Sequence, residues 1–459
     1  MSTLTQLRDA IGGRLLPGEV PDATVGAVIS DSREIEQGSM FWALDGPNHD
    51  GADFVNEAFQ RGAAGAVVAQ NTVVPAGCWA VRVDDTHRAL NDWARYRRGC
   101  CDGTVVAVTG SVGKTTTRQM IHAVLQSRLR GTASPRNFNN HYGVPLSMTA
   151  IEPDHDYAVL ELGASRLGEI ASLAELSRPS IGVITRIGDA HLGGFGDRKR
   201  IARAKSELLA ALPKNGRAVL GDDPWLRSVA GQCAAKITWV GIDEGCDIRA
   251  ADLRSSDGRL LFRVDDCQFV VPVWGRHHVV AALAAVAVGQ MMGIDLDDIA
   301  RALHKFAPMP MRCQMQFIRG ASIINDTYNS NPTAMEAALE LLRDFDADGR
   351  RIVVSGDMGE LGGKSAILHR RLGRQVVEIA GADLLVACGK FAKHVIDGAR
   401  VAGMPRVRTI CCRNVDDSLP YVGQAVLPGD VVLVKGSRMM AMERVVEALR
   451  QYPRRRAAS

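Results

Sequence analysis

A glycine-rich turn between an apolar strand and a helix is the feature that most constrains the fold of this chain. The apolar run Val105–Thr109 is followed by Gly110, Ser111, Val112, Gly113, Lys114, Thr115 and Thr116, and a helix is predicted from Thr115 to about Leu129. The backbone N–H groups of such a turn, with the N-terminus of the helix, cradle phosphate oxygens. The lysine reaches the β- and γ-phosphates, and the next hydroxyl can contact Mg²⁺. We therefore expect residues 110–116 to bind the phosphates of a nucleotide.

The positions of the glycines narrow the class of phosphate loop. The general pattern G-x-x-x-x-G-K-[ST] would place its first glycine at position 108, where this chain has Val108. The glycine stands at Gly110 instead, which gives the compact form T-G-x-x-G-K-T-T. This form resembles the loop of Mur ligases and folylpolyglutamate synthases more than that of GTPases or kinases.

Strands and helices are predicted to alternate along most of the chain. Strands are expected at Val105–Thr109, Tyr157–Glu161, Ser180–Thr185, Arg217–Gly221, Ser322–Asn325, Arg351–Ser355, Asp383–Ala387, Arg408–Cys411 and Val431–Lys435. Such alternation implies parallel sheets with right-handed crossovers. The segment Ala250–Val273 differs, because its short strands around Asp257-Gly258 and Asp265-Asp266 favour a small antiparallel insertion.

We predict an α/β protein of three domains, which also fits 459 residues at about 150 residues per domain. Residues 1–100 form a small α/β domain, and residues 101–312 form a central, P-loop NTPase-like domain with a parallel sheet. A linker at Ala307–Pro310 precedes a Rossmann-like domain over residues 313–459.

Charge and cysteine usage limit the partners and the compartment. The 55 Lys and Arg exceed the 51 Asp and Glu by only 4, so no electrostatic argument supports a nucleic-acid or membrane partner. The ten cysteines include two adjacent pairs and no C-x-x-C motif, which is typical of reduced thiols. There is no secretory core in Met1–Ala10, and the longest apolar run, Val279–Met292, is too short to span a bilayer and is predicted as a buried helix. We expect a cytoplasmic monomer.

Several sequence blocks, spread over nearly the whole chain, resemble the Mur ligase family. Their order and spacing together are far more specific than any one block. The blocks lie at Asp31–Gly46, Thr109–Thr116, Asn137–Ser147, Glu161–Ile170, Ala190–Gly196, Ala204–Leu209, Gly275–Ala285, Asn325–Met335, Gly356–Gly362 and Leu433–Glu443. The D-N-P-R block of the branch that adds a diamino acid is absent, and GDMGELG at Gly356–Gly362 is similar to the MurF type, the branch that adds a dipeptide.

The resemblance implies an ADP-forming acid–amino acid ligase. In this branch, ATP phosphorylates the terminal carboxylate of UDP-N-acetylmuramoyl-tripeptide, and the amine of D-alanyl-D-alanine attacks the acyl phosphate. The implied ligands are therefore small molecules: the UDP-tripeptide, D-alanyl-D-alanine, ATP and Mg²⁺, with two ions. The implied role is peptidoglycan synthesis, and through it cell shape and division. Whether the third residue of the acceptor peptide is meso-diaminopimelate or lysine stays open.

The resemblance also implies the catalytic centre. Lys114 is the phosphate-binding lysine. Glu161, at the end of a strand whose carboxyl end faces the crevice, resembles a metal ligand together with Thr115, and His191 resembles the ligand of the second ion. Lys205 matches the lysine that the family typically carbamylates into a metal ligand. Outside such blocks, a single histidine is more often structural, and a lysine on an amphipathic helix is usually solvated.

Further residues match positions that contact ATP or the peptide substrates. The implied ATP contacts are His278, Arg312, Asp326, Tyr328 and Asn329, and the implied substrate contacts are Ser32, Arg33, Asn137, Asn139, Asn140, Glu360 and His369. Asp326 could equally cap the helix that begins near Pro332.

The chain also departs from the family pattern at several positions. His278 and Ala281 replace two asparagines, Met311 replaces a glycine, and Gly363, Lys364 and Ala366 stand where acidic residues are usual. The loss of an amide at position 278 puts a hydrogen bond to adenine in doubt.

Two other functions remain open on the sequence alone. A related Mur or folylpolyglutamate-type ligase would add a different amino acid, and a P-loop kinase would transfer phosphate without consuming an amine.

Overall fold

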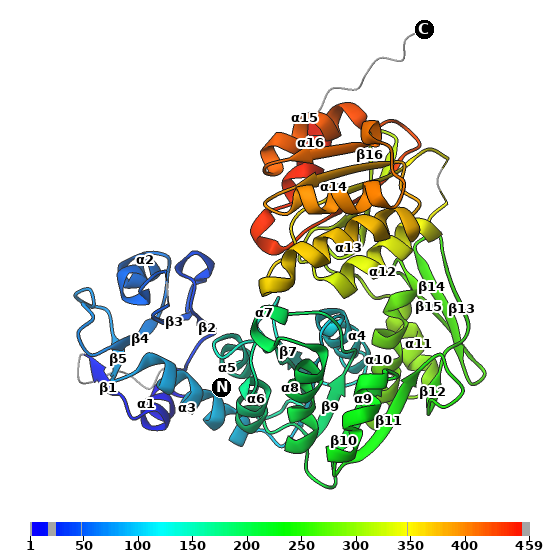
Figure 1. Ribbon diagram of the computed structural model, residues 1–459. Coiled ribbons are helices and arrows are strands. Elements are labelled where there is room, and N and C mark those ends of the chain that lie inside the picture. Colours follow the sequence, from blue (N-terminus) through cyan, green and yellow to red (C-terminus); the bar gives the residue numbers. More distant parts are fainter. Residues whose placement is uncertain (1, 17–23, 47, 347, 452–459) are drawn as a thin grey trace.

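The computed structural model describes residues 2–16, 24–46, 48–346 and 348–451, and these residues form four β-sheets. The chain forms three successive α/β units, each a sheet with its helices (Figure 1). These units are called the N-terminal, central and C-terminal layers below. The α/β class with parallel sheets is thereby confirmed.

The N-terminal layer is a sheet of five strands in the order β1-β5-β4-β3-β2. Its strands are β1 (Arg14–Leu16), β2 (Val28–Ile29), β3 (Met40–Trp42), β4 (Gly65–Ala69) and β5 (Ala80–Val83), and its helices are α1 (Leu4–Ile11), α2 (Val55–Gln60) and α3 (Thr86–Gly99). Only β1 runs antiparallel to its neighbour. Trp42 and Trp93 are fully buried in this layer, and the indole of Trp42 donates to the carbonyl of Thr86 at 2.9 Å.

The central layer is a parallel sheet of seven strands in the order β12-β11-β10-β9-β6-β8-β7. The strands are β6 (Thr104–Thr109), β7 (Gly131–Ala133), β8 (Tyr157–Glu161), β9 (Ile181–Ile184), β10 (Arg217–Gly221), β11 (Lys236–Gly241) and β12 (Ile248–Arg249). The helices are α4 (Lys114–Leu125), α5 (Gly143–Met148), α6 (Glu169–Ser177), α7 (Leu192–Phe195), α8 (Arg198–Ala211), α9 (Pro224–Val229), α10 (Val279–Met291) and α11 (Leu296–His304).

The predicted antiparallel insertion and the predicted buried helix are both present. The insertion consists of β13 (Ala251–Ser256), β14 (Arg259–Val264) and β15 (Cys267–Val271). Its first turn has positive φ at Asp257 and Gly258, as a two-residue hairpin requires. Helix α10 is buried along most of its length, and no helix in the described ranges is long and apolar enough to cross a membrane.

The C-terminal layer is a sheet of six strands in the order β16-β17-β21-β18-β19-β20. The strands are β16 (Gln314–Ile318), β17 (Ala321–Asp326), β18 (Arg351–Ser355), β19 (Leu384–Cys388), β20 (Thr409–Cys412) and β21 (Val431–Lys435), with helices α12 (Pro332–Asp344), α13 (Ser365–Glu378), α14 (Ala392–Val401), α15 (Val415–Ala425) and α16 (Glu443–Gln451). Strand β16, which the sequence did not predict, is an antiparallel edge strand whose Phe317 is exposed.

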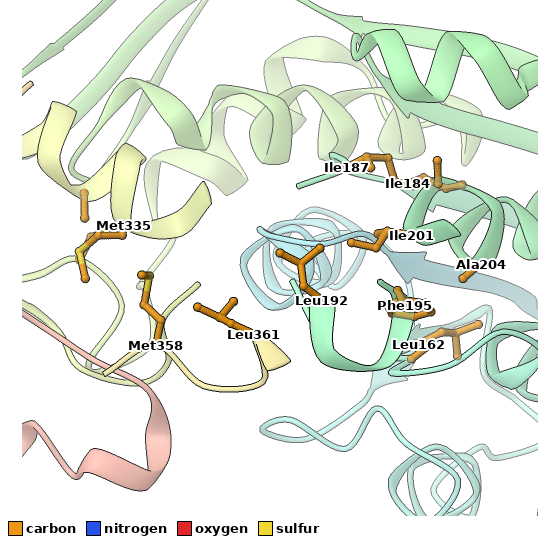
Figure 2. Packing of buried hydrophobic residues seen from close by; sticks show 14 of the residues in the cluster. Leu162, Ile184, Ile187, Leu192, Phe195, Ile201, Ala204, Met335, Met358 and Leu361 are labelled. Atoms are coloured by element: carbon orange, nitrogen blue, oxygen red, sulfur yellow. The ribbon is translucent and has the colours of Figure 1, made fainter. Parts of the chain in front are cut away.

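The central and C-terminal layers share one hydrophobic core. Leu192 and Phe195 of α7 belong to the same buried cluster as Met335, Met358 and Leu361 of the C-terminal layer (Figure 2). Polar contacts reinforce this packing, because the hydroxyl of Thr333 accepts a hydrogen bond from the Asp189 amide at 2.9 Å. The shared core holds the carboxyl end of the central sheet against the C-terminal layer.

Candidate active site

One cleft of about 1670 Å³ lies between the central and C-terminal layers and collects most of the residues predicted from the sequence. The predicted residues that line it are Ser111, Val112, Gly113, Lys114, Thr115, Thr116, Asn137, Asn139, Asn140, Glu161, His191, His278, Arg312, Asp326, Tyr328, Asn329 and Glu360. Gly110, Lys205, His369, Ser32 and Arg33 are not among the lining residues.

The phosphate loop has the backbone geometry that its glycines predict. Gly110 has φ of 144°, and a Cβ there would lie 2.1 Å from Oγ1 of Thr185, so that only glycine fits. Gly113 has φ of 80° and precedes helix α4 directly. The Lys114 ammonium donates to the carbonyl of Gly110 at 2.9 Å, and burial lowers its pKa, an effect that nearby Glu161 opposes.

Glu161 ends β8 as a buried carboxylate, one oxygen of which accepts no hydrogen bond. Its Oε1 accepts a hydrogen bond from the Asn139 amide at 2.7 Å. Its Oε2 lies 3.6 Å from Nε of Arg118 but is without a hydrogen bond. A buried carboxylate oxygen in this condition is costly unless a ligand satisfies it. Glu161 is thus placed to receive a cation at the cleft wall.

Lys205 lies behind the cleft on α8 and is almost fully buried. Its ammonium has one weak partner, the carbonyl of Ala164 at 3.3 Å, and it lies 5.7 Å from the centre of the Phe195 ring. Burial, with a smaller contribution from Lys114, lowers its pKa to about 7. It is therefore not the solvated lysine that a helix pattern alone would favour.

His191 connects the two layers at the cleft. Its Nδ1 lies 2.5 Å from Oε2 of Glu360, and this contact holds the pKa of Glu360 below its usual range. The Glu360 carbonyl accepts from the Gly193 amide at 2.8 Å. Lys364, which stands where the family usually has an acidic residue, donates to the carbonyl of Gly196 at 2.7 Å. These contacts fasten α7 to the loop that precedes α13.

Arg312 makes the junction contact to the phosphate loop. Its guanidinium donates to Oγ1 of Thr115 at 3.0 Å and lies 4.2 Å from the centre of the Tyr328 ring. Met311 has φ of 61°, a left-handed conformation that favours glycine, which is the usual residue there. A methionine at position 311 thus strains the backbone, but Arg312 still lines the cleft.

Replacing Arg312 by lysine is expected to raise the KM for ATP about tenfold to 100-fold, which corresponds to one lost charge-assisted hydrogen bond. A lysine cannot both stack on Tyr328 and donate to Thr115. The measurement is the initial rate at varied ATP concentration, with exposed Arg406→Lys as the control. An unchanged KM would remove Arg312 from the nucleotide site.

Asp326 is held by a buried lysine at the end of the neighbouring strand β21. Lys435, 2 % exposed, lies 2.5 Å from Oδ2 of Asp326 and donates to the carbonyl of Asn329 at 2.8 Å. The two residues are paired in register at the ends of β17 and β21. The alternative role of Asp326 as a helix cap is wrong, because Asn331 caps α12 and accepts from the Ala334 amide at 2.8 Å.

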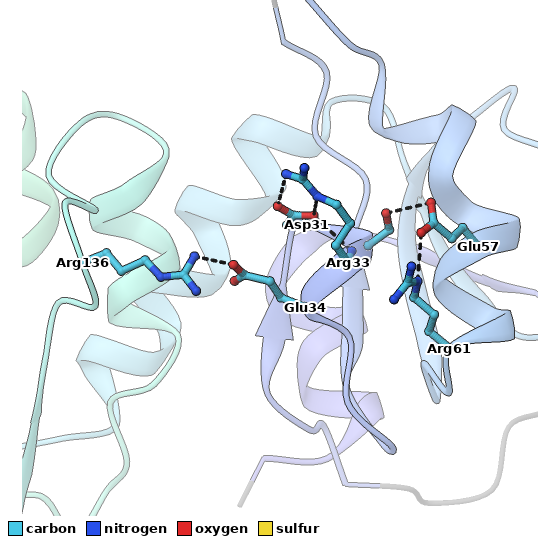
Figure 3. Close-up of polar contacts among 7 residues, drawn as sticks. Asp31, Arg33, Glu34, Glu57, Arg61 and Arg136 are labelled. Atoms are coloured by element: carbon cyan, nitrogen blue, oxygen red, sulfur yellow. Dashed lines mark hydrogen bonds and ion pairs between the residues drawn. The ribbon is translucent and has the colours of Figure 1, made fainter. Parts of the chain in front are cut away.

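Two predicted substrate residues of the N-terminal layer have partners within the protein. Ser32 donates to Glu57 at 3.1 Å, and Arg33 forms a two-pronged pair with Asp31 at 2.8 and 2.7 Å (Figure 3). Arg136, on the loop that carries the predicted asparagines, contacts Glu34 across the gap between the layers (Figure 3). Arg33 remains largely exposed, so it can still reach a ligand.

His369 is fully buried on α13 and does not reach the cleft. Its Nε2 accepts from the Met358 amide at 2.9 Å, and its Nδ1 lies 2.7 Å from the carbonyl of Ser365. Burial lowers its pKa, which fits a neutral ring that holds the Gly356–Gly362 loop. Asn140 has a similar local role, because its side chain accepts from the Gly143 amide at 2.8 Å near the start of α5.

Sequence reasoning missed Arg118, His277 and Cys313. Arg118 could have been found, because it lies four residues after Lys114 and so shares a face of α4. Cys313 and His277 are 3.8 Å apart between Sγ and Nε2. No sequence signal joins these two residues, which come from different layers.

Comparison with known proteins agrees with this architecture. Residues 108–289 match the family model described as Mur ligase middle domain, and residues 311–438 match the one described as Mur ligase, glutamate ligase domain. A Bacillus subtilis protein named UDP-N-acetylmuramoyl-tripeptide–D-alanyl-D-alanine ligase is 34% identical, over 98% of this chain and 99% of its own. An Escherichia coli protein of the same name is 33% identical over 98% of each chain.

Solved structures give the same result. A crystal structure of MurF from Acinetobacter baumannii superposes with a TM-score of 0.85 at 31% identity, covering 98% of each chain. The MurF ligase of Thermotoga maritima, in complex with ADP, has a TM-score of 0.79 at 29% identity over 94% of this chain and 99% of its own. This chain therefore belongs to the Mur ligase family.

Proposed function

We propose that this chain is an ATP-dependent ligase that joins D-alanyl-D-alanine to UDP-N-acetylmuramoyl-tripeptide in the synthesis of peptidoglycan precursors. Two relatives named UDP-N-acetylmuramoyl-tripeptide–D-alanyl-D-alanine ligase match this chain over 98% of its length, and their name supports this choice of substrates. The observation that carries the chemistry is the contact between Arg312 and Thr115, because it brings a cation from the domain junction onto the phosphate loop.

The reaction needs an activated carboxylate. A free carboxylate resists attack by an amine because oxide is a poor leaving group, whereas an acyl phosphate loses inorganic phosphate readily. ATP transfers its γ-phosphoryl group to the tripeptide carboxylate and leaves as ADP. The amine of D-alanyl-D-alanine then attacks the acyl carbon, the tetrahedral intermediate expels phosphate, and the amine loses a proton. The protein must position these groups and offset their negative charge.

The charged residues of the cleft suit that task. Lys114 and Arg312 bring two positive charges to the phosphate loop, where the nucleotide and the carboxylate must meet. Lys435 and Asp326 neutralise each other, so they shape the C-terminal wall without adding net charge. Preorganised cations of this kind stabilise charge that develops in the transition state.

The cleft also fits Mg²⁺. The Oε2 atom of buried Glu161, which accepts no hydrogen bond, is a hard anionic oxygen, and Thr115 adds a hydroxyl at the phosphate loop. These residues would hold one ion, and His191 with Lys205 would hold a second. When bound, Mg²⁺ offsets the repulsion between the two anionic substrates.

Carbamylation of Lys205 would turn it into an oxygen ligand. Only the neutral amine adds to CO₂, and a pKa of about 7 leaves much of Lys205 neutral near neutral pH. The nearly complete burial of its side chain would protect the carbamate from water.

The layers would divide the substrates among them. Residues 1–100 would bind the UDP-sugar through Ser32, Arg33 and the strand and turn at Phe41–Gly46. Residues 101–312 would hold ATP, and residues 313–459 would close over it and receive the dipeptide near Glu360. The loop that holds Asn137, Asn139 and Asn140 also holds Arg136, which contacts Glu34 of the N-terminal layer. This loop would bind the peptide part of the substrate between the N-terminal and central layers.

Phosphate release tests the function directly. With ATP, Mg²⁺ and the UDP-tripeptide, we expect release of phosphate to depend on D-alanyl-D-alanine and to match the amount of amide product. Lys114→Met is the control, since it should lose the activity and so exclude a contaminating ATPase. Equal phosphate release with and without the dipeptide would contradict the ligase assignment. Replacement of the dipeptide by single amino acids would favour a sister ligase.

A further inference from the structure

Two histidines and a cysteine meet at the junction of the central and C-terminal layers. His277 and His278 lie in the short helical turn Arg276–His278, and Cys313 follows the junction arginine. One ligand atom from each of the three residues lies within 4.8 Å of the others, and Sγ of Cys313 is 3.8 Å from Nε2 of His277. All three residues line the cleft.

The backbone holds these side chains in place. Gly275 has φ of 99°, and a Cβ at that position would lie 2.6 Å from the ring of His277, so the absence of a side chain lets the imidazole pack there. Cys313 has φ of 47°, and its amide donates to Oδ1 of Asp326 at 3.2 Å. Cys313 is therefore fixed to the end of β17, and the His277 ring packs against its own turn at Gly275.

We propose that His277, His278 and Cys313 form a binding site for a thiophilic divalent cation such as Zn²⁺, with a fourth coordination position open to the cleft. Imidazole and thiolate are both Zn²⁺ ligands, and a zinc site with three protein ligands keeps one position open. A tetrahedral ion with such bonds separates sulfur and nitrogen by about 3.5 Å, close to the 3.8 Å found here.

The electrostatic surroundings define the proton balance of binding. Burial lowers the pKa of both histidines, that of His277 to about 4, so both rings are neutral, the form that binds metals. Burial raises the pKa of the Cys313 thiol. Binding must therefore break the S–H bond, form the S–metal bond and release the proton to solvent. Asp326 favours the cation, whereas Lys435, Arg312 and Arg186 oppose it.

The donor set separates this site from a magnesium site. Mg²⁺ takes mainly oxygen ligands and does not compete well for a thiolate. A second cluster, Glu152, Asp154 and His155, is the other group of this kind in the described part of the chain. Its two carboxylates are already paired with Arg130, which leaves less charge for an ion.

Occupancy would have a mechanical consequence. The histidines precede the linker and Cys313 follows it, so a bound ion would cross-link the two layers beside Arg312.

Cobalt titration of the full chain, free of nucleotide, tests the site. We expect one Co²⁺ per chain, with a thiolate-to-cobalt charge-transfer band in the near ultraviolet that Zn²⁺ displaces and Mg²⁺ does not. Cys313→Ser should abolish the band. His278→Asn should weaken Co²⁺ binding by about tenfold or more. Loss of a residue that merely hydrogen-bonds to a metal ligand already costs about tenfold in affinity, and loss of a ligand should cost at least as much.

The controls separate this site from other thiols. Cys411→Ser removes an exposed cysteine and should leave the band and the affinity unchanged. A band that persists in Cys313→Ser, or an affinity that His278→Asn does not alter, would overturn the proposal. Because no substrate is present, failure here is independent of the ligase function.

Discussion

Lys205→Ala is expected to abolish ligase turnover, with a loss of about 1,000-fold or more, because it would remove a ligand for a catalytic ion worth several kcal/mol. The side chain is 2 % exposed and does not line the cleft, so it cannot act through direct contact with a substrate. We attribute the effect to the proposed carbamate, which the buried and partly neutral amine could form.

The measurement is the rate of amide formation, followed by rescue. Added short carboxylates should restore part of the activity of Lys205→Ala by supplying the missing oxygen ligand. Lys199→Ala, an exposed lysine on the same helix, is the matched control and should keep full activity. Thermal unfolding separates loss of chemistry from loss of fold. Full activity of Lys205→Ala would exclude Lys205 from the metal site.

Glu161→Gln should lower turnover by about 1,000-fold through the other ion, the one that Glu161 would hold with Thr115. The amide keeps the size of the side chain and an oxygen to accept from Asn139. It loses the negative charge that Mg²⁺ prefers, and it points an NH₂ group toward Arg118. The substitution therefore tests charge at nearly constant shape.

Nucleotide binding with and without Mg²⁺ distinguishes this effect from unfolding. Glu161→Gln should bind ATP without metal as well as the unchanged chain does, and it should lose the strengthening that Mg²⁺ provides. Glu175→Gln, exposed on α6, should behave like the unchanged chain. If Mg²⁺ still strengthens ATP binding to Glu161→Gln, the assignment of Glu161 as a ligand is wrong.

Much of the fold was predictable because its signals are local. The strands at Tyr157–Glu161, Arg217–Gly221, Arg351–Ser355 and Val431–Lys435 agree with the structure to the residue, since buried parallel strands are short, continuous apolar runs between helices. Strand β16 was missed, because it is an edge strand that mixes glutamines with an exposed phenylalanine. Its alternation of polar and apolar residues extends over only four residues, Gln314–Phe317.

The candidate site divides in the same way. The phosphate loop could be located because its conformation depends on glycines within a few residues of one another. The environment of His369 could not, because the same histidine in the same block serves equally as a ligand-binding or a buried residue. Only the packing of α13 decides that its ring supports the loop at Gly356–Gly362.

The sequence by itself determined the α/β class and the position of the phosphate loop. Most of the residues that line the cleft also lie in sequence blocks that resemble those of the family. The tertiary structure decided which charges meet: Thr115 with Arg312, 197 residues apart, and Asp326 with Lys435, 109 residues apart. It also decided that Lys205 is buried and that His277 faces Cys313. The physical reason is that loop conformation depends on neighbouring dihedral angles, whereas burial and charge pairing depend on how distant layers pack.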